Sequence, residues 1–464
     1  MKFTVGFYGA TGNVTGSCYC LCANQKNILI DCGLYQERNL KDRNWAKFPI
    51  PPKKIDAVVL THAHLDHCGL LPKLVREGFR GPIYCTAPTA EIAKIVLLDS
   101  ARINEEDAEF KRRRHAREKR KSRFPVVPLY TEEDAKETLP LFKTWKFATP
   151  LELGEGLSVE FIEVAHILGA ASVRFTITQD GEQRRLLFSG DVGRWDMPIL
   201  RDPSPIGEAD YVIVESTYGN RIHGSQEDIP SQLANIINET RAAGGNIIIP
   251  SFAIERAQEL LYFLSVLLKE DKIPHLRIFL DSPMAVKVSM VFKRFPQFFD
   301  QETTKLQHTF RASNISLVHS VADSKSINHI RGSVIVIAGS GMCTGGRIKH
   351  HLTHNIERPE STVLFVGYQA NGTLGRIILD GEKRVRILGE MYDVQARIER
   401  IFGFSAHADQ AELLRWLSSI SNTPRKVFVT HGEPDAAKTF AEVLRAEKNW
   451  DVEIPQYKDQ VILD

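Results

Sequence analysis

Four side chains that can bind a metal lie within six residues of this chain. They are His62, His64, Asp66 and His67, in the run His62-Ala63-His64-Leu65-Asp66-His67. Three imidazoles and a carboxylate this close together repel one another when protonated and are costly to desolvate, unless a cation neutralises them. Because side chains alternate sides in an extended segment, His62 and His64 can face one metal ion. Asp66 and His67 can then turn toward a second.

The segments on either side of this run are typical of an α/β fold. The apolar stretch Ala57–Leu60 predicts a buried strand before the run, and Gly69–Glu77 predicts a helix after it. A strand, a loop with polar groups and a helix form the order in which α/β folds present functional residues. The context therefore favours a functional site over a histidine-rich surface loop.

Three further candidate ligands each come at the end of a predicted strand. These are His166 after Val159–Val164, Asp191 at the end of Leu186–Asp191, and His431 after Lys426–Thr430. A single His in such a position is more often a packing or capping residue. Three of them, beside the His62–His67 run, predict that the loops after these strands meet at one metal site.

Together these residues resemble the metallo-β-lactamase superfamily of dinuclear zinc hydrolases. Three more segments, Val214–Gly219, Phe404–Asp409 and Thr430–Glu433, are similar to motifs A, B and C of its β-CASP ribonuclease branch. That branch includes the endonuclease subunit of the cleavage and polyadenylation specificity factor and its prokaryotic homologues. A His at motif C, here His431, goes with the RNA-processing members of the branch. The resemblance runs over the whole chain.

The resemblance implies two Zn²⁺ ions per chain and a set of site residues. One zinc ion takes His62, His64 and His166, the other takes Asp66, His67 and His431, and Asp191 bridges them. Asp31, after the predicted strand Asn27–Ile30, matches the first acidic motif and orients ligands. Asp66 also counts among the catalytic residues. His407 resembles the general acid that protonates the leaving 3′-oxygen, with Glu215 holding its other ring nitrogen.

The resemblance and the glycine-rich segments also suggest contacts to substrate. The candidates are Ser405, Ser340, Arg256, Arg347 and Arg376. Each arginine is as compatible with a surface ion pair as with the RNA backbone. Ser340 lies in a segment that also fits a plain strand-to-helix turn.

The expected fold is α/β, a metallo-β-lactamase αββα sandwich with an inserted β-CASP domain. Short apolar strands separated by helical stretches such as Ala253–Lys269 favour a parallel sheet in the inserted part. We expect the metallo-β-lactamase domain over 1–219 and 401–464 and the β-CASP cap over 220–400. We expect the catalytic domain to begin at the first strand, without the amino-terminal RNA-binding module of some archaeal members.

The function implied by the resemblance is a zinc-dependent ribonuclease acting on single-stranded RNA. The expected reaction is endonucleolytic attack of a metal-activated water on phosphorus, which leaves a 3′-hydroxyl. A 5′-to-3′ exoribonuclease of the same family is the main alternative. A thioester or lactone hydrolase, a DNA nuclease and a non-catalytic scaffold are weaker ones, the last because every ligand position is filled.

The composition indicates the cellular compartment and the kinds of partner, but it says little about the reaction. The chain has 464 residues and a net charge of +2, so affinity for nucleic acid must come from local patches. Seven cysteines without a CxxC pair favour a reducing compartment, and no segment reads as a signal peptide or membrane span. We therefore expect a cytoplasmic protein with RNA as partner and no membrane partner. A homodimer is possible, although no segment identifies its interface.

Two segments have open interpretations. The basic run 111–123 is either a solvated stretch or a contact for phosphates. The loop Gly9–Gly16 resembles a dinucleotide-binding motif, but its third glycine comes one residue late and a strand is expected to follow. We interpret it as a tight turn and expect no dinucleotide cofactor. The segment Pro88–Phe110, before the basic run, is predicted to be helical.

Overall fold

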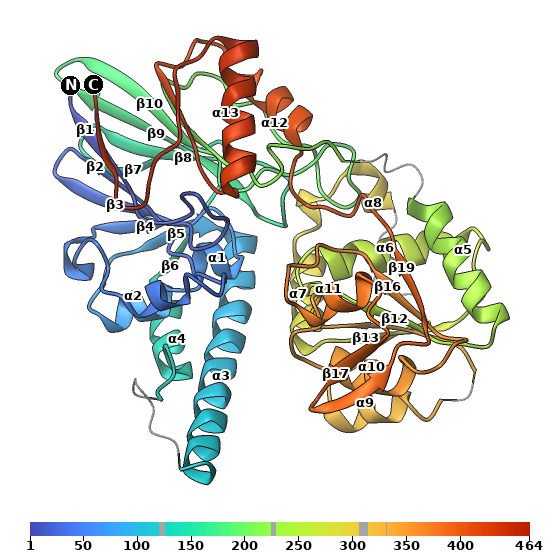
Figure 1. Ribbon diagram of the computed structural model, residues 1–464. Helices are drawn as coiled ribbons and strands as arrows, with labels where there is room; N and C mark the ends of the chain where they lie inside the picture. The colour runs from blue at the N-terminus through green and yellow to red at the C-terminus, as the bar shows by residue number, and fades with distance from the viewer. Residues whose placement is uncertain (120–125, 224–228, 306–313, 331) are drawn as a thin grey trace. The chain divides into compact units, whose positions relative to one another are not determined.

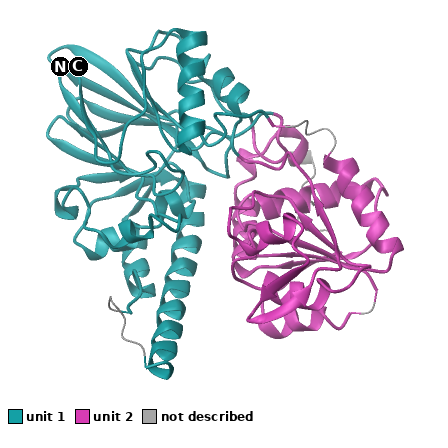
Figure 2. Cartoon of the chain, viewed as in Figure 1, with its two compact units in different colours: residues 1–195, 202–222, 407–464 teal, residues 196–201, 223–406 magenta. Residues whose placement is uncertain are grey.

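The computed structural model describes residues 1–119, 126–223, 229–305, 314–330 and 332–464. They form two compact units (Figures 1 and 2). Unit 1 contains residues 1–195, 202–222 and 407–464, and unit 2 contains residues 196–201 and 223–406. Within the described part, no helix combines the length and apolarity needed to cross a membrane.

Unit 1 contains two seven-stranded sheets. In sheet order, the first is β22 (Gln460–Leu463), β1 (Phe3–Phe7), β2 (Tyr19–Ala23), β3 (Lys26–Ile30), β4 (Ala57–Val59), β5 (Ile83–Thr86) and β6 (Phe142–Trp145). The second is β21 (Val452–Glu453), β20 (Lys426–Val429), β11 (Tyr211–Val214), β10 (Glu182–Phe188), β9 (Ala171–Gln179), β8 (Leu157–Glu163) and β7 (Leu151–Gly154). Both sheets mix parallel and antiparallel pairs.

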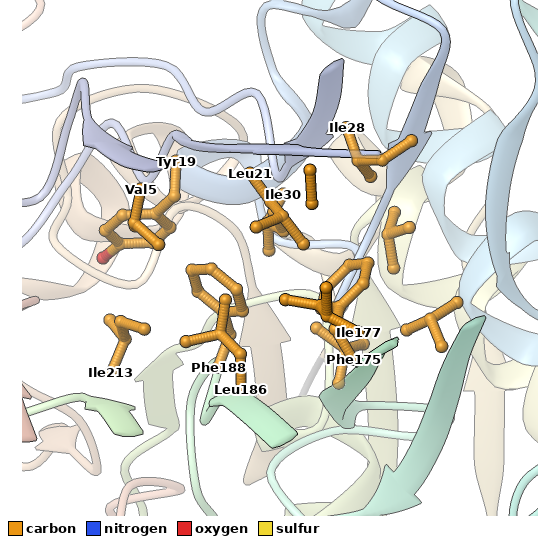
Figure 3. Packing of buried hydrophobic residues seen from close by; sticks show 14 of the residues in the cluster. Val5, Tyr19, Leu21, Ile28, Ile30, Phe175, Ile177, Leu186, Phe188 and Ile213 are labelled. Atoms are coloured by element: carbon orange, nitrogen blue, oxygen red, sulfur yellow. The ribbon is translucent and has the colours of Figure 1, made fainter. Parts of the chain in front are cut away.

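The core of unit 1 lies between these sheets. Alternate residues of the two sheets, such as Val5, Leu21 and Ile30 on one and Phe175 and Phe188 on the other, point toward each other and are buried (Figure 3). This apolar layer fixes the strands and therefore the loops at their ends.

Helices cover the outer faces of both sheets. The first sheet is flanked by α1 (Leu65–Cys68), α2 (Leu71–Arg76), α3 (Ala87–Arg117) and α4 (Glu132–Thr138), and the second by α12 (Gln410–Leu417) and α13 (Pro434–Lys448) (Figure 1). Short 3₁₀ turns occur at Lys41–Trp45, Pro52–Lys54 and Leu139–Leu141. The expected αββα sandwich is confirmed.

Unit 2 is built on one parallel sheet. Its order is β14 (Ile315–Leu317), β13 (Arg277–Asp281), β15 (Val334–Ala338), β12 (Ile247–Pro250), β16 (Thr362–Phe365) and β19 (Arg397–Arg400). Every neighbouring pair is parallel. The central strands are apolar on both faces because helices cover both, which confirms the parallel sheet predicted from the sequence.

Two separate apolar cores hold these helices against the sheet of unit 2. One face packs against α5 (Ile229–Ala242), α6 (Arg256–Lys269) and α7 (Pro283–Arg294). The other packs against α9 (Val321–Ile327), α10 (Ile348–Asn355), α11 (Leu374–Leu379) and the hairpin of β17 (Arg384–Ile387) and β18 (Glu390–Asp393). The short helix α8 (Gln301–Lys305) and a 3₁₀ turn at Pro296–Phe298 complete the unit.

Three local predictions need correction. The helix expected at Gly69–Glu77 is α2 and is shorter, Leu71–Arg76, and a separate helical turn, α1, precedes it at Leu65–Cys68, where the sequence predicted only the ligand loop. The helix expected to end at Phe110 continues to Arg117, since the residues that follow Phe110 include good helix formers. The segment Gly9–Gly16 belongs to a loop between β1 and β2 that is longer than a tight turn, although a strand does follow it.

Candidate metal centre

All seven predicted ligands lie together in unit 1, on the loops that follow its strands. His62 and His64 follow β4 in extended backbone, and Asp66 and His67 lie in α1 directly after them. His166, Asp191 and His431 lie on the loops after β8, β10 and β20. Their metal-binding atoms form two clusters, one of His62, His64, His166 and Asp191 and one of Asp66, His67 and His431.

The first cluster brings three imidazoles together edge to face, with interplanar angles of 79° to 84°. His64 Nδ1 lies 3.1 Å from His62 Nε2 and 3.2 Å from His166 Nε2. Two nitrogens that bind one zinc ion tetrahedrally at 2.0–2.1 Å stand roughly 3.3 Å apart. His64 Nδ1 therefore has the spacing of a shared-ion ligand to both other nitrogens, and all three atoms lie within 4.8 Å of one another.

The second cluster is similar but somewhat wider. His67 Nε2 and His431 Nε2 are 3.1 Å apart, and Asp66 Oδ2 lies 3.9 Å and 3.7 Å from them. Two imidazoles and a carboxylate form a donor set that suits zinc.

Asp191 stands between the two clusters and offers one oxygen to each. Its Oδ2 lies 3.5 Å from His62 Nε2 and 3.4 Å from His166 Nε2. Its Oδ1 lies 3.2 Å from His67 Nε2 and 3.5 Å from His431 Nε2. This carboxylate is buried, and its Oδ1 has no hydrogen-bond partner among the described residues. A buried carboxylate oxygen without a partner is costly, so the residues fit a bound cation here.

Burial and mutual charge separate the pKa values of the cluster. Burial lowers the pKa of His62, helped by the neighbouring His67, and burial also lowers the pKa of His64 to about 4. Burial opposes the charge of His67 and His431 too, but neighbouring carboxylates together outweigh it and raise the pKa of both: Asp191 and Asp31 act on His67, and Asp191 and Asp66 act on His431. The pKa of Asp191 is held well below its usual range by His431 and His67, although burial acts the other way. Without metal, His62 and His64 therefore favour the neutral form that binds a cation, whereas His67 and His431 would release a proton when metal binds.

Polar groups behind the cluster fix the orientation of three of the rings. Asp31 lies 2.7 Å from Nδ1 of His67. Thr61 donates its hydroxyl to Asp31 and lies 3.1 Å from Nδ1 of His62. Thr217 lies 3.2 Å from Nδ1 of His431. Each contact leaves the opposite ring nitrogen, Nε2, to face the cluster.

Thr61 and Thr217 were not among the residues predicted from the sequence. Their signal is weak, since each is a Thr inside a motif, Thr61 just before His62 and Thr217 two residues after Glu215. Only the folded structure shows that these hydroxyls reach the rings.

His407 lies at the edge of the cluster, beside Glu215. Its Nδ1 is 3.4 Å from Oε1 of Glu215 and 3.8 Å from Oδ2 of Asp191, and its ring lies 4.4 Å from that of His166. Glu215 is buried and also accepts the backbone N–H of Val192. Burial lowers the pKa of His407, but the surrounding carboxylates, Glu215 first and then Asp191 and Asp66, together outweigh burial and raise that pKa to about 9.

The backbone is strained on three of the loops that carry these residues. Asp31, Ala165 and His431 have φ values of 58°, 57° and 47°, in the left-handed region that few non-glycine residues adopt. Such strain clusters at functional sites, where the surrounding fold enforces it. Here the sandwich of two sheets provides that constraint.

The candidate substrate residues lie in unit 2. Arg256 is buried, pairs with Glu259 and lies over the ring of Phe404. Arg347 pairs with the buried Asp281 at 2.6 Å, and Arg376 pairs with Asp380 at 2.7 Å. The sequence allowed either an ion pair or a contact with the RNA backbone for each of these arginines. The structure gives all three an ion-pair partner.

Ser340 and Ser405 have different settings in this unit. Ser340 is bonded within its own loop, where its hydroxyl accepts the N–H of Gly345. Ser405 lies on the segment between β19 and His407 and is partly buried. Of the basic run 111–123, residues 111–117 form the end of α3, and 120–123 lie outside the described residues.

Comparison with known families and proteins agrees with this geometry. The metallo-β-lactamase superfamily matches residues 11–212, the β-CASP domain matches 257–378, and the RNA specificity domain of Zn-dependent metallo-hydrolases matches 391–455. Fold and site thus define a Zn-dependent metallo-hydrolase.

Similar proteins of known name show which branch of the metallo-hydrolases this chain belongs to. Ribonuclease TTHA0252 of Thermus thermophilus is 39% identical over 94% of this chain and 95% of its own length. Transcription termination factor FttA of Methanosarcina mazei is 30% identical over 93% of this chain and 67% of its own. A crystal structure of a protein of unknown function from Enterococcus faecalis covers 100% of both chains with a TM-score of 0.58 at 12% identity, a likeness of fold alone. The chain belongs to the β-CASP ribonuclease family of the metallo-β-lactamase superfamily, and is a hydrolytic nuclease by that membership.

Proposed function

We propose that this chain is a two-zinc endoribonuclease that cleaves single-stranded RNA and leaves a 3′-hydroxyl. The observation that carries the proposal is the position of Asp191, which gives one oxygen to each of two three-ligand clusters. That arrangement suits two ions rather than one. The name of the Thermus thermophilus relative supports RNA as the substrate.

The ligands would divide into two sets. His62, His64 and His166 would hold one ion, and Asp66, His67 and His431 the other, with Asp191 shared. When bound, zinc lowers the pKa of a coordinated water and stabilises negative charge on the oxygens of the phosphate.

The remaining residues would handle orientation and protons. Asp31, Thr61 and Thr217 hold the outer nitrogens of three ligand rings, so that Nε2 stays directed at the ions. His407, held at Nδ1 by Glu215, would donate the proton that its other nitrogen carries to the leaving oxygen. A raised pKa keeps that imidazole protonated near neutral pH, as a general acid requires.

Cleavage of two RNA substrates of one sequence tests the proposal. The first is linear, single-stranded and 5′-labelled, and the second is circular, so that it has no end from which an exonuclease could start. We expect zinc-dependent internal cuts in both RNAs and about two zinc ions per chain. His64→Ala should abolish the internal cuts, whereas His275→Ala, which removes an exposed His of unit 2, should leave them unchanged.

The other outcomes point elsewhere. Cleavage of the linear RNA alone, from its 5′ end, would assign the exonuclease activity of the same family. Cleavage of matched DNA in preference to RNA would make the chain a DNA nuclease. Two intact RNAs with full zinc content would leave a thioester or lactone hydrolase.

A further inference from the structure

The carboxyl-terminal half of α3 extends beyond the other elements of unit 1 (Figure 1). The first half of this helix is buried through residues such as Ile92, Ala93 and Leu97. From Arg102 onward most side chains are exposed, and Ala108 is the last that is buried. Half of the helix therefore presents a free surface in the described structure.

Two large apolar side chains lie on one line of this surface. Ile103 is 47% exposed and Phe110 is 65% exposed. They are seven residues apart, so at 3.6 residues per turn they point in directions that differ by only about 20°. A phenyl ring this open to water on an outlying helix is unfavourable unless another surface covers it.

The charges beside this line are ordered along the helix. Glu106 and Asp107 precede Phe110, and Arg113 and Arg114 follow it. At about 100° per residue, Glu106 and Arg113 lie on one flank of the line, and Asp107 and Arg114 lie on the other. All four side chains are exposed.

We propose that two copies of this chain associate through this face, with their α3 helices antiparallel and a two-fold axis at Phe110. Reversal of the helix direction about Phe110 places Glu106 opposite Arg113 of the second copy and Asp107 opposite its Arg114, on the same flanks. The two Phe110 rings then cover each other, and Ile103 meets the alkyl part of Arg117 from the other chain. An isologous interface needs this self-complementary order of charge, and an unrelated partner would not.

The contacts present within one chain leave these groups available. Arg113 pairs with Glu109 and Arg114 with Glu118, one turn away along the exposed helix, and such solvated pairs are weak. Within the described part of the chain, Glu106 and Asp107 form no ion pair. Glu106 and Asp107, which flank this line, also disfavour RNA there, since phosphates would meet them beside the arginines.

The expected association is weak. The free face from Ile103 to Arg117 is roughly 21 Å long and one helix wide. Such a face buries less area than a standard stable interface, which takes about 800 Å² from each partner. We expect a dimer that forms at micromolar concentrations and dissociates on dilution and at high salt.

Sedimentation equilibrium of the full-length protein, at about 1 to 100 µM in low and high salt, tests this proposal. Phe110→Glu should give monomers at every concentration. The double variants Arg113→Glu/Arg114→Glu and Glu106→Arg/Asp107→Arg should each be monomeric alone, because like charges then face each other. Their equimolar mixture should form a heterodimer, because the swapped charges become complementary.

A matched control changes the same charge elsewhere on this helix. Lys111→Glu/Arg112→Glu alters the net charge as much as the arginine variant, on side chains away from the Ile103–Phe110 line, and should still dimerise. A wild type that stays monomeric at the highest concentration would overturn the proposal. A failure of the two charge-reversed variants to associate would overturn it too. The proposal would also be overturned if Arg113→Glu/Arg114→Glu lost RNA binding but kept the sedimentation mass of the wild type. The basic run 111–123 would then be a contact for phosphates.

Discussion

At the scale of single residues, the site depends on which atom each side chain presents. Asp191 gives Oδ2 to one cluster and Oδ1 to the other, and the outer nitrogens of His62, His67 and His431 are held by Thr61, Asp31 and Thr217. The metal site thus consists of ligands whose direction is fixed from behind. His407 borders the ligand cluster but faces Glu215, so its role can be separated from that of the ligands.

His407→Ala is expected to keep the bound zinc and lose turnover by a factor of roughly 10² to 10⁴, the usual contribution of a general acid. Asp191→Ala is its contrast, because it removes the shared carboxylate and should lose metal as well as activity. Metal analysis beside single-turnover cleavage separates the two. If His407→Ala retained full activity, another group would have to be the acid.

The pairing of His407 with Glu215 predicts a pH dependence of stability in metal-free protein. Because the pKa of His407 is raised from 6.5 to about 9, the folded state binds the proton more tightly than the unfolded state. The stabilisation is complete below about pH 6.5 and disappears as the pH rises through 9. The thermal midpoint of wild type should therefore exceed that of His407→Gln at pH 6, and the gap should close by about pH 10. A gap of constant size would remove the ion pair as its cause.

Asp31→Asn tests the support behind the ligands. The amide keeps the shape of the side chain but loses the charge that holds Nδ1 of His67. Loss of such a partner lowers metal affinity by roughly 10- to 100-fold. Competition with a zinc chelator measures this, and full affinity in the variant would mean that Thr61 and the backbone position the ring unaided.

At the scale of elements, the site depends on loops that approach one another without side chains between them. Gly33 is pressed against the carbonyl of Asp66, and a Cβ there would lie 1.6 Å from that oxygen. Gly193 has a similar place two residues after Asp191, where its Cβ would lie 2.1 Å from the carbonyl oxygen of Ala165. The loops that carry His166 and Asp191 are therefore in backbone contact, and the N–H of Gly193 bonds to Val164.

Gly193→Ala is expected to push these two loops apart. The new methyl meets backbone atoms that cannot rotate away, so we expect a loss of at least about 1–3 kcal/mol of stability together with weaker zinc binding. Gly345→Ala is the control, since a Cβ at Gly345 meets no atom within 4 Å. Thermal unfolding and zinc titration of both variants check this, and equal behaviour would show that the loops can adjust.

At the scale of the whole molecule, the two units have separate apolar cores. The core of unit 1 lies between its two sheets, and those of unit 2 lie on the two faces of its parallel sheet. All seven candidate ligands belong to unit 1. Metal binding should therefore stabilise one unit directly.

Zinc removal is expected to lower the unfolding temperature of unit 1 and leave that of unit 2 nearly unchanged. A ligand at 100 times its dissociation constant adds about 2.7 kcal/mol to the state that binds it. Calorimetry with and without a chelator should resolve two transitions of which one moves. A single transition that shifts as a whole would show that the units unfold together.

The sequence by itself determined which residues carry the chemistry and which kinds of element hold them. His62, His166, Asp191 and His431 could be selected because ligand side chains directly after apolar strands are a local pattern, visible from residue type and spacing. The parallel sheet of unit 2 followed in the same way from short apolar strands separated by helices.

Only the tertiary structure decided how these pieces meet. It showed that Thr61 and Thr217 reach the ligand rings, that Asp191 stands between two clusters, and that Arg256 is buried against Glu259. Thr217 and His431 are 214 positions apart, so a local pattern carries no information about their contact. Even the near neighbours Thr61 and His62, or Arg256 and Glu259, show their contact and burial only in the fold. They arise when the packing of the two sheets brings their loops to one place, so distance in the fold decides them rather than distance along the chain.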